Sequence, residues 1–300
     1  GKVRIFETKI QPGSQLADIP LKDLRLPQDV LAGLIFRNNR MIIPHGDDYL
    51  LPHDNTFFVG ASGEIEKFSK HFVGTGIKAP ERVMIIGAGR TGRTLAKMLD
   101  KQGVQVKVIE KDAERSRMVA ERIEEGIVVR GDGTDIDLLT QEGVGEADVV
   151  ICLTADDKLN LMLALLAKHL GAARTIVRVA RIEYVDLMEK VGVDIVLSSR
   201  LLAAGEILAF ARRGGVVSVA LLEGAKAEAM EVIVQKGSYV ENKKLMDLQL
   251  PKECLICAFV RDDEAFVPTG QSSLQAGDRA ILFIRMEFAN KVMKYFAGKA

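Results

Sequence analysis

Two segments of the chain match each other without a gap, and this duplication limits the possible fold more than any other feature of the sequence. Pro27 corresponds to Pro251, an offset of 224 residues. At that offset the second copy repeats these residues of the first: Gln11, Gly13, Ser14, Asp23, Leu24, Leu26, Leu31, Arg37, Pro44, Gly46, Leu50, Asp54, Lys67, Lys70 and Phe72. Each copy predicts a strand, a short helix ending at a Leu-x-Leu-Pro segment, two or three strands with a glycine turn, and a closing helix. One small α+β domain is therefore present twice.

The segment between the copies has a different hydrophobic pattern. After Pro80, short apolar runs alternate with helical patterns, which is typical of βαβ units and a parallel sheet. We expect six parallel strands, at residues 82–86, 104–109, 127–130, 147–153, 175–179 and 194–197. Helices are expected after the first strand as far as Leu99, from Asp112 onward, and at 156–170 and 183–190. The predicted fold class is α/β, a doubly wound parallel-sheet Rossmann-like domain flanked by two small α+β domains.

A glycine-rich turn follows the first of these strands and opens a helix. It consists of Gly87, Ala88, Gly89, Arg90, Thr91 and Gly92. In this context the first glycine permits a tight turn, the second lets backbone N–H groups approach a pyrophosphate, and the third lets the helix pack on the strand. The positive end of the helix favours an anion there. The alternative is a tight turn that binds no ligand.

Glu110 closes the second strand, where a carboxylate can accept hydrogen bonds from both hydroxyls of an adenosine ribose. The same charge disfavours NADP, because it repels a 2′-phosphate. The alternative is a solvated strand end. Its neighbour Lys111 is included among the candidate binding residues.

Two further polar clusters follow predicted strands. Asp132 and Gly133 come after the third strand, and Asp132 either accepts from an adenine amino group or caps the next helix. Thr154, Ala155 and Asp156 come after the fourth strand, where capping of the following helix by Thr154 or Asp156 is favoured and a binding role can coexist with it. All these positions belong to the carboxyl edge of the sheet, where open α/β sheets bind ligands.

The charge balance and the apolar pattern exclude several classes of protein. The chain has 41 basic and 41 acidic residues. It therefore lacks the excess of basic residues that is typical of proteins that bind nucleic acid. The best apolar run, residues 161–167, is far shorter than the roughly 20 residues of a membrane helix. No signal peptide is expected, and three cysteines fit a reducing compartment, so we expect a cytoplasmic protein.

The histidine and cysteine residues are not placed where a catalytic group would be expected. None of His45, His53 and His71 recurs in the second copy, and His169 falls at a helix end remote from the strand ends. Cys254 and Cys257 have the spacing of a metal or redox pair but lie in an apolar run that predicts a strand, on which residues three apart face opposite ways. We therefore expect no catalytic residues and no metal site.

A last amphipathic helix is predicted at residues 200–213, ending at Gly214 and Gly215, which also form a plausible hinge. Its apolar surface is broader than a single stripe, which favours a helix that packs against two surfaces. We expect it to pack across a homodimer; the alternative is packing on its own sheet alone.

Four motifs carry a resemblance to a known family: Ile-Ile-Gly-Ala-Gly-Arg-Thr-Gly at 85–92, Val-Ile-Glu-Lys-Asp at 108–112, Gly-Asp-Gly-Thr at 131–134 and Leu-Thr-Ala-Asp-Asp at 153–157. The central segment resembles the KTN or RCK domain, and the flanks resemble TrkA-C domains. Together they resemble TrkA-type regulatory subunits of bacterial potassium uptake systems. The corresponding boundaries are 1–78, 79–215 and 216–300.

The resemblance implies binding of NAD(H), or of ATP or ADP at the same site, without turnover. Gly87, Gly89, Arg90, Thr91 and Gly92 are then expected to hold phosphates, Glu110 the ribose, Asp132 the adenine side, and residues 154–156 the rim. It also implies a homodimer or larger ring, an integral membrane potassium transporter subunit (TrkH/TrkG-like) as partner, and a location at the inner membrane through that transporter.

One departure from the family pattern is that the chain begins with a flank domain. Proteins of this kind carry two nucleotide domains, so we expect the first to be missing, with Gly1 at the cut. The alternative function is an NAD-dependent oxidoreductase with unusual small flanking domains.

Overall fold

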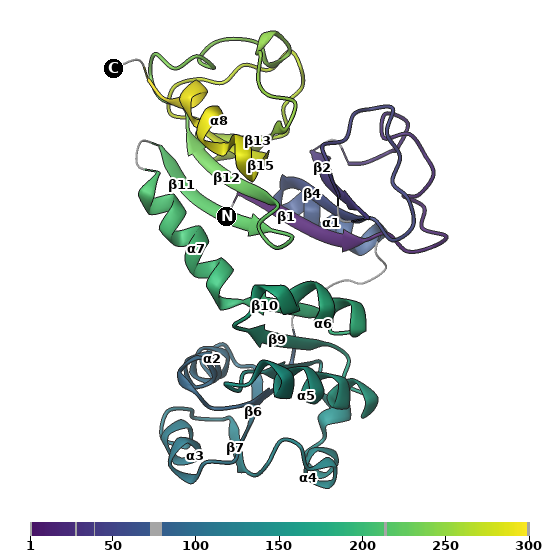
Figure 1. Cartoon of the computed structure of the whole chain (residues 1–300), viewed down its shortest axis with the longest axis vertical. Helices are drawn as coiled ribbons and strands as arrows, with labels where there is room; N and C mark the ends of the chain where they lie inside the picture. Colours follow the sequence, from purple (N-terminus) through teal and green to yellow (C-terminus); the bar gives the residue numbers. More distant parts are fainter. Residues whose placement is uncertain (1, 28, 39, 73–79, 213–214, 299–300) are drawn as a thin grey trace. The chain divides into compact units, whose positions relative to one another are not determined.

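The computed structural model forms two compact units (Figure 1). One unit is Ala79–Leu201, and the other joins Gly1–Lys78 to Leu202–Ala300. The two copies of the repeat thus fold into one body. The residues that the structure describes are 2–27, 29–38, 40–72, 80–212 and 215–298.

The central unit contains a parallel six-stranded sheet, which confirms the prediction. Its strands are β5 (Arg82–Ile86), β6 (Gln105–Glu110), β7 (Ile127–Arg130), β8 (Val149–Cys152), β9 (Thr175–Val179) and β10 (Ile195–Ser198). They lie in the order β10-β9-β8-β5-β6-β7. The chain order reverses between β5 and β8, so this carboxyl edge is the switch point at which open α/β sheets bind ligands.

Helices cover both faces of this sheet. They are α2 (Arg90–Asp100), α3 (Ala113–Ala120), α4 (Ile136–Gln141), α5 (Asp157–His169) and α6 (Val185–Val191), with the 3-10 helices η1 (Val144–Glu146) and η2 (Ile182–Tyr184). Val83 and Ile85 of β5 share a core with α2 and α3, whereas Met84 and Ile86 share another with α4, α5 and α6. This alternation confirms a doubly wound fold.

The two flanks have the same fold, strand for strand. The first is an antiparallel sheet in the order β1-β4-β2-β3, made of β1 (Val3–Lys9), β2 (Val30–Arg37), β3 (Arg40–Ile42) and β4 (Asn55–Ala61), with helix α1 (Ser62–Phe72). At the offset of 224 residues these become β12 (Ala227–Ile233), β13 (Cys254–Arg261), β14 (Glu264–Phe266), β15 (Arg279–Arg285), and η4 (Met286–Phe288) with α8 (Ala289–Phe296). An additional strand, β11 (Val216–Leu222), pairs with β12.

Two expectations about helices need correction. The short helix before the Leu-x-Leu-Pro segment is only a 3-10 helix, η3 (Leu245–Asp247), in the second copy, and the described residues of the first copy have turns there. Too few residues separate that segment from the positive-φ positions Asp18 and Asn242 to nucleate an α-helix. The last amphipathic helix is α7 (Ser199–Ala211), and the predicted positions 213 and 214 lie outside the described residues.

An arginine–aspartate pair closes each flank in the same way. Arg37 donates from Nε and Nη2 to the Asp54 carboxylate at 2.9 and 2.8 Å, and Arg261 does so to Asp278 at 2.8 and 2.6 Å. Both carboxylates are buried, at 1% and 3% exposure. The repeated Arg and Asp therefore have a structural role, since a bidentate pair satisfies both carboxylate oxygens.

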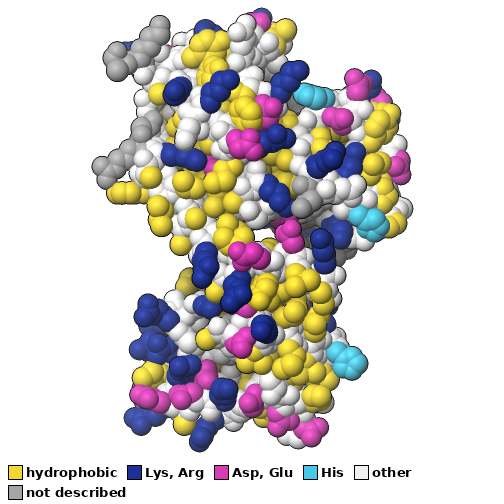
Figure 2. All heavy atoms as spheres, in the orientation of Figure 1, with side chains coloured by type: hydrophobic (Ala, Val, Ile, Leu, Met, Phe, Trp, Pro, Cys, Tyr) yellow, Lys and Arg dark blue, Asp and Glu magenta, His cyan; other side chains and the backbone are white. Residues whose placement is uncertain are grey.

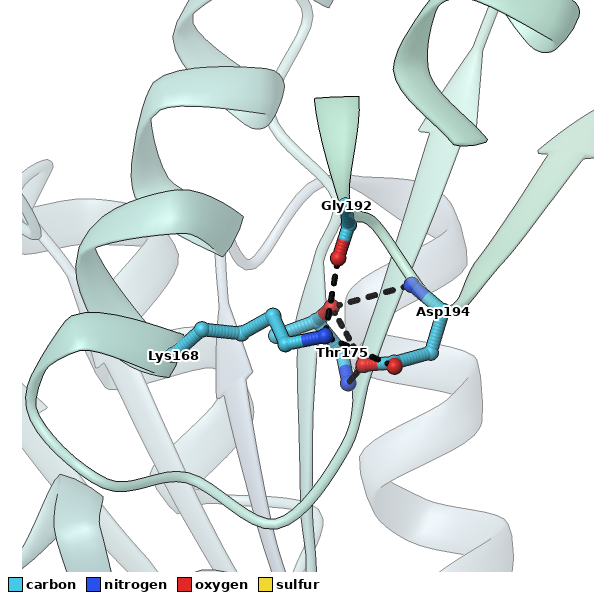
Figure 3. Close-up of polar contacts among 4 residues, drawn as sticks. All are labelled: Lys168, Thr175, Gly192 and Asp194. Atoms are coloured by element: carbon cyan, nitrogen blue, oxygen red, sulfur yellow. Dashed lines mark hydrogen bonds and ion pairs between the residues drawn. The ribbon is translucent and has the colours of Figure 1, made fainter. Parts of the chain in front are cut away.

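In the central unit, Asp194 joins three elements (Figure 3). Its Oδ2 accepts from the amide and hydroxyl of Thr175 at 2.8 and 2.9 Å, and its Oδ1 accepts from Lys168 Nζ at 2.8 Å. Lys168 also donates to the Gly192 carbonyl at 2.8 Å. The end of α5 is thereby tied to the starts of β9 and β10. Burial acts to raise the pKa of Asp194, but the bonds from Lys168 and Thr175 outweigh it and lower that pKa.

A lowered pKa means that the charged Asp194 stabilises the folded state above the ordinary carboxyl pKa of about 3.9, and that this contribution is lost as the pH falls through the folded-state pKa. We expect Asp194→Asn to lower the free energy of unfolding by about 1 kcal/mol at pH 7, a modest value because the group is partly exposed. The deficit should shrink toward pH 3. Urea unfolding at both pH values measures it. Glu125→Gln, at an exposed carboxylate of the same unit, is the control; an equal deficit in both variants, or one independent of pH, contradicts this role.

Candidate functional site

A cavity of about 370 Å³ lies at the carboxyl edge of the parallel sheet, at the switch point. Residues at or just after the ends of β5, β6, β7, β8 and β9 line it. Of the residues that the sequence indicated, the lining includes Gly87, Gly89, Arg90, Thr91, Glu110, Lys111, Asp132, Gly133, Thr154, Ala155 and Asp156. Ala88 and Gly92 are buried beside it and do not line it. Four separate motifs thus meet at one place.

The glycine turn has the geometry that a phosphate site needs. Gly87 has φ of +103°, in the left-handed region. A Cβ atom at Gly92 would lie 2.1 Å from the Gly87 carbonyl oxygen, so only glycine lets α2 approach β5 this closely. A Cβ atom at Gly89 would meet nothing within 4 Å, and this position faces the open space of the cavity.

Helix α2 begins without a side-chain cap. Gly89 is its N-cap residue and makes no side-chain hydrogen bond, whereas Asp112, Asp135 and Asp156 cap α3, α4 and α5. The first amide groups of α2 therefore keep their donors for another acceptor. Together with the positive end of the helix, they form a favourable environment for an anion.

Glu110 has a role that the sequence did not indicate. Its side chain is buried at 7% exposure, and its two oxygens accept from the amides of Ala88 at 2.6 Å and Asp112 at 2.9 Å. The carboxylate therefore fixes the glycine turn. Each oxygen keeps a second lone pair, and Glu110 lines the cavity, so the predicted bond to a ribose is compatible with this role.

Asp132 does not cap the following helix, which corrects one of the two alternatives. Asp135 caps α4 by accepting from the amides of Asp137 and Leu138. Asp132 Oδ1 instead accepts from the amide and hydroxyl of Thr134 at 3.0 and 2.9 Å. The amide bond, then the hydroxyl bond, lowers the pKa of Asp132 against a smaller opposing effect of burial. The side chain is therefore an exposed anion at the cavity wall.

The cluster after β8 is built around a fully buried asparagine. Asn160 Oδ1 accepts from the Thr154 amide and hydroxyl at 2.9 and 2.7 Å, and its Nδ2 donates to the carbonyls of Thr154 and Arg178 at 3.1 and 3.0 Å. Asp156 caps α5, as one of the predicted alternatives stated. Asn160 thus connects the loop after β8 to the end of β9.

Two lining residues, Arg115 and Arg178, had no signal in the sequence. Gly131 and Thr134 also line the cavity; they belong to the Gly-Asp-Gly-Thr motif but were not among the candidate binding residues. Arg178 lies inside an apolar strand, where nothing marks it. Arg93, outside the lining, is half-buried and contacts Met118 Sδ at 2.9 Å.

The cysteine and histidine residues do not form a second site in the described part of the chain. Cys254 and Cys257 lie in different cores of their domain, on opposite faces of the strand as predicted. Burial raises the pKa of the Cys254 thiol to about 12 and that of Cys257 well above its ordinary value. All four histidines are exposed, and the described residues contain no cluster of three metal-ligating side chains.

A second cavity, of about 480 Å³, lies at the opposite edge of the parallel sheet. Four of its charged groups form ion pairs within the protein: Lys107 with Glu142 at 2.9 Å, and Arg82 with Glu146 at 3.0 Å. Asp100 accepts from three backbone amides, those of residues 124, 125 and 126. This cavity is larger, but it has no glycine turn and lies at the amino ends of the strands, so we place the functional site in the first cavity.

No helix in the described ranges is long and apolar enough to cross a bilayer. A model of the TrkA-N domain matches residues 83–199, and a model of the TrkA-C domain matches residues 5–73 and 229–297. These matches cover the central unit and both copies of the repeat.

Curated relatives that match nearly the whole chain are named as Trk system potassium uptake proteins. Trk system potassium uptake protein TrkA homolog 2 of Methanosarcina mazei is 36% identical over 299 residues, which are 99% of this chain and 66% of that protein. Trk system potassium uptake protein TrkA of Vibrio alginolyticus is 33% identical over 290 residues, 94% of this chain and 63% of that protein. The chain thus spans less than two thirds of the Vibrio protein.

Among solved structures, the GsuK channel aligns with a TM-score of 0.51 at 22% identity, over 98% of this chain and 53% of that chain. The GsuK channel bound to NAD aligns with a TM-score of 0.50 at 21% identity, over the same shares. These two likenesses show a shared fold.

Proposed function

Because the chain belongs to the family of proteins built from TrkA-N and TrkA-C domains, we propose that it is a nucleotide-binding regulatory part of a potassium uptake system. The observation that carries this proposal is the uncapped start of α2 at the switch-point cavity, with Glu110 beside it. The relatives that match the whole chain are potassium uptake proteins by name.

The residues present fit an adenine nucleotide, either NAD(H) or ATP or ADP. The turn from Gly87 to Gly92 and the α2 amides would hold phosphates, Glu110 the ribose, and Asp132 the adenine side. Thr154, Ala155 and Asp156 would form the rim. Open space at Gly89 and a cavity of about 370 Å³, within the usual range of about 300–1,000 Å³ for cofactor sites, support this fit.

We further propose that the site binds without turnover. Hydride transfer needs a proton donor or acceptor beside the nicotinamide, and the described residues that line the cavity include no histidine or tyrosine. Its lysine, Lys111, is next to Glu110, at the end assigned to the ribose of the adenosine. The partner would be an integral membrane potassium transporter subunit, TrkH/TrkG-like, with the protein in the cytoplasm and peripheral to the inner membrane through that subunit. Its domains would be those with the boundaries 1–78, 79–215 and 216–300.

Helix α7 supports a homodimer or larger ring. On one side Leu208 and Ala209 pack against the core of the second flank, and a Cβ atom at the buried Gly205 would lie 2.5 Å from the Val219 carbonyl oxygen. On the opposite face Ile207 is 66% exposed, and Leu202, three residues before Gly205 on the packed stripe, is 62% exposed. Figure 2 shows hydrophobic side chains on the molecular surface at this helix. A helix that is apolar on both sides is typical of an interface.

The first test of the proposal is nucleotide binding by Glu110→Ala. Hydrogen bonds to charged groups contribute about 1.5–3 kcal/mol, and the variant also loses the bond that fixes the glycine turn, so ADP and NADH affinity should fall about tenfold or more. Calorimetry measures this. Glu114→Ala, an exposed carboxylate of α3, should bind as the parent does.

The parent should also bind NADPH more weakly than NADH, and Glu110→Gln should narrow that difference because it removes the charge. Unchanged ADP affinity in Glu110→Ala would remove Glu110 from the site. Equal affinity of the parent for NADPH and NADH would remove the ribose assignment. Steady oxidation of NADH with an added carbonyl substrate would favour the oxidoreductase instead.

The second test concerns the dimer. Leu202→Glu with Ile207→Glu places charges at two exposed positions of α7 and spares the core, whereas Leu208 packs against the core and its substitution would perturb folding. We expect light scattering to report a dimer or larger ring for the parent and a monomer for this variant. Met98→Glu, at a 55% exposed methionine of α2, should keep the parent's mass. A monomeric parent contradicts the proposal.

The third test concerns the change in assembly. A ligand shifts a two-state equilibrium only through its differential affinity for the two states, so NADH and ATP must favour different dimer geometries if their effects are opposite. A spin label at Arg40→Cys, on the exposed start of β3, should therefore report different distances between protomers with the two ligands. The buried native cysteines should not react.

The equivalent exposed position in the second flank is Glu264. Labels at both positions of one protomer, diluted with unlabelled protein, provide the control. This distance should not change, because one apolar core joins the two flanks. Identical distances between protomers with NADH and ATP would end the switching mechanism and leave nucleotide binding intact.

A further inference from the structure

One group in the nucleotide cavity has no partner within the described protein. Arg178 lies near the end of β9 and lines the cavity, and its Nε atom is buried without a hydrogen bond. Among the described residues of the lining, it is the one buried side-chain nitrogen or oxygen in this condition. Arg178 as a whole is half-buried, but its buried Nε–H donor lacks an acceptor among the described residues, which is unfavourable, so this end of the cavity is suited to a ligand that supplies one.

The neighbouring polar side chains of the described lining make hydrogen bonds elsewhere and none to Arg178 Nε. The Thr154 hydroxyl contacts Asn160 Oδ1 at 2.7 Å, and Asp156 Oδ1 accepts from two amides of α5. Asn160 Nδ2 donates to the Arg178 main-chain carbonyl and so fixes the backbone from which the side chain extends. The side chain that lines the cavity therefore extends from a fixed point of β9.

The order of the strands gives the direction from which that group comes. Glu110 ends β6 and Asp132 follows β7, on one side of β5, whereas β9 lies on the other side, beyond β8. The glycine turn after β5 lies between them. A nucleotide with its ribose at Glu110 and its first phosphates at the turn therefore extends its far end toward Arg178.

We propose that Arg178 binds the terminal phosphate of a nucleoside polyphosphate and selects for it over a nucleotide whose far end is neutral. This inference rests on the proposed nucleotide function. A guanidinium and a phosphate form paired, charge-assisted hydrogen bonds, which a neutral nicotinamide riboside cannot reproduce. Arg178 is thus a specificity-determining residue: it favours ATP over NADH at a site whose other contacts, to adenosine and the first phosphates, serve both.

The test is calorimetric titration of ATP and NADH into the parent, Arg178→Met, Arg178→Lys and Arg174→Met. Arg174→Met removes the same charge just before the start of β9, at the opposite edge of the sheet, and should bind as the parent does. We expect Arg178→Met to weaken ATP binding about tenfold or more and NADH binding less than about threefold. Arg178→Lys should recover part of the ATP affinity, since lysine keeps the charge and loses the fork.

A melting curve without ligand separates binding from folding. Arg178→Met should melt at the same temperature as the parent or higher, because it removes a buried donor that has no acceptor among the described residues of the ligand-free protein. Unchanged ATP affinity in Arg178→Met, or equal losses for ATP and NADH, overturns the role of Arg178 and leaves the proposed function standing. A parent that binds neither ligand overturns the proposed function itself.

Discussion

The candidate site depends on the close approach of the start of α2 to the end of β5. That approach is possible because Gly92 leaves room for the Gly87 carbonyl oxygen, and the turn is then held from β6 by the Glu110 bond to the Ala88 amide. No side chain caps α2, so its first amides, at residues that line the cavity, keep their donors for another acceptor. The parallel order of the strands brings the other lining residues, which follow β7 and β8 or end β9, to the same carboxyl edge.

The duplicated flanks are explained by a core that they build together. It contains Leu34, Phe36, Phe57 and Val59 of the first copy and the equivalent positions of the second, which are Ala258, Val260, Ile281 and Phe283. The same faces of the two sheets therefore pack on each other. At its centre Gly33 lies against Phe283 and Cys257, where a Cβ atom would be 2.7 Å from the ring and 3.3 Å from Sγ. Cys257 is the equivalent of Gly33 in the second copy. The lack of a side chain at Gly33 thus leaves room for the Cys257 side chain.

The sequence predicted the strands of the central unit closely, because buried parallel strands are short apolar runs bounded by turn residues. β5, β7 and β9 begin and end where predicted. α4 was expected only as the helix that Asp132 caps in one alternative, without bounds, because six residues are too few for a helical period, and β11 was not predicted. The candidate residues were foreseeable where a motif fixes the backbone. Arg178 was not, since only strand order places it in the cavity.

Strand β9 is held at both ends, and this gives the site a route to α7. At its start Thr175 is bonded to Asp194, and at its end the Arg178 carbonyl accepts from Asn160. Arg178 pairs in register with Leu197 of β10, and α7 begins at Ser199, two residues later. A ligand that engages Arg178 therefore acts on a strand whose hydrogen-bonded neighbour continues directly into the helix with the exposed apolar side. For a nucleotide to control assembly through this connection, the protein needs two arrangements of α7, and the nucleotide must bind the protein with different affinity in each.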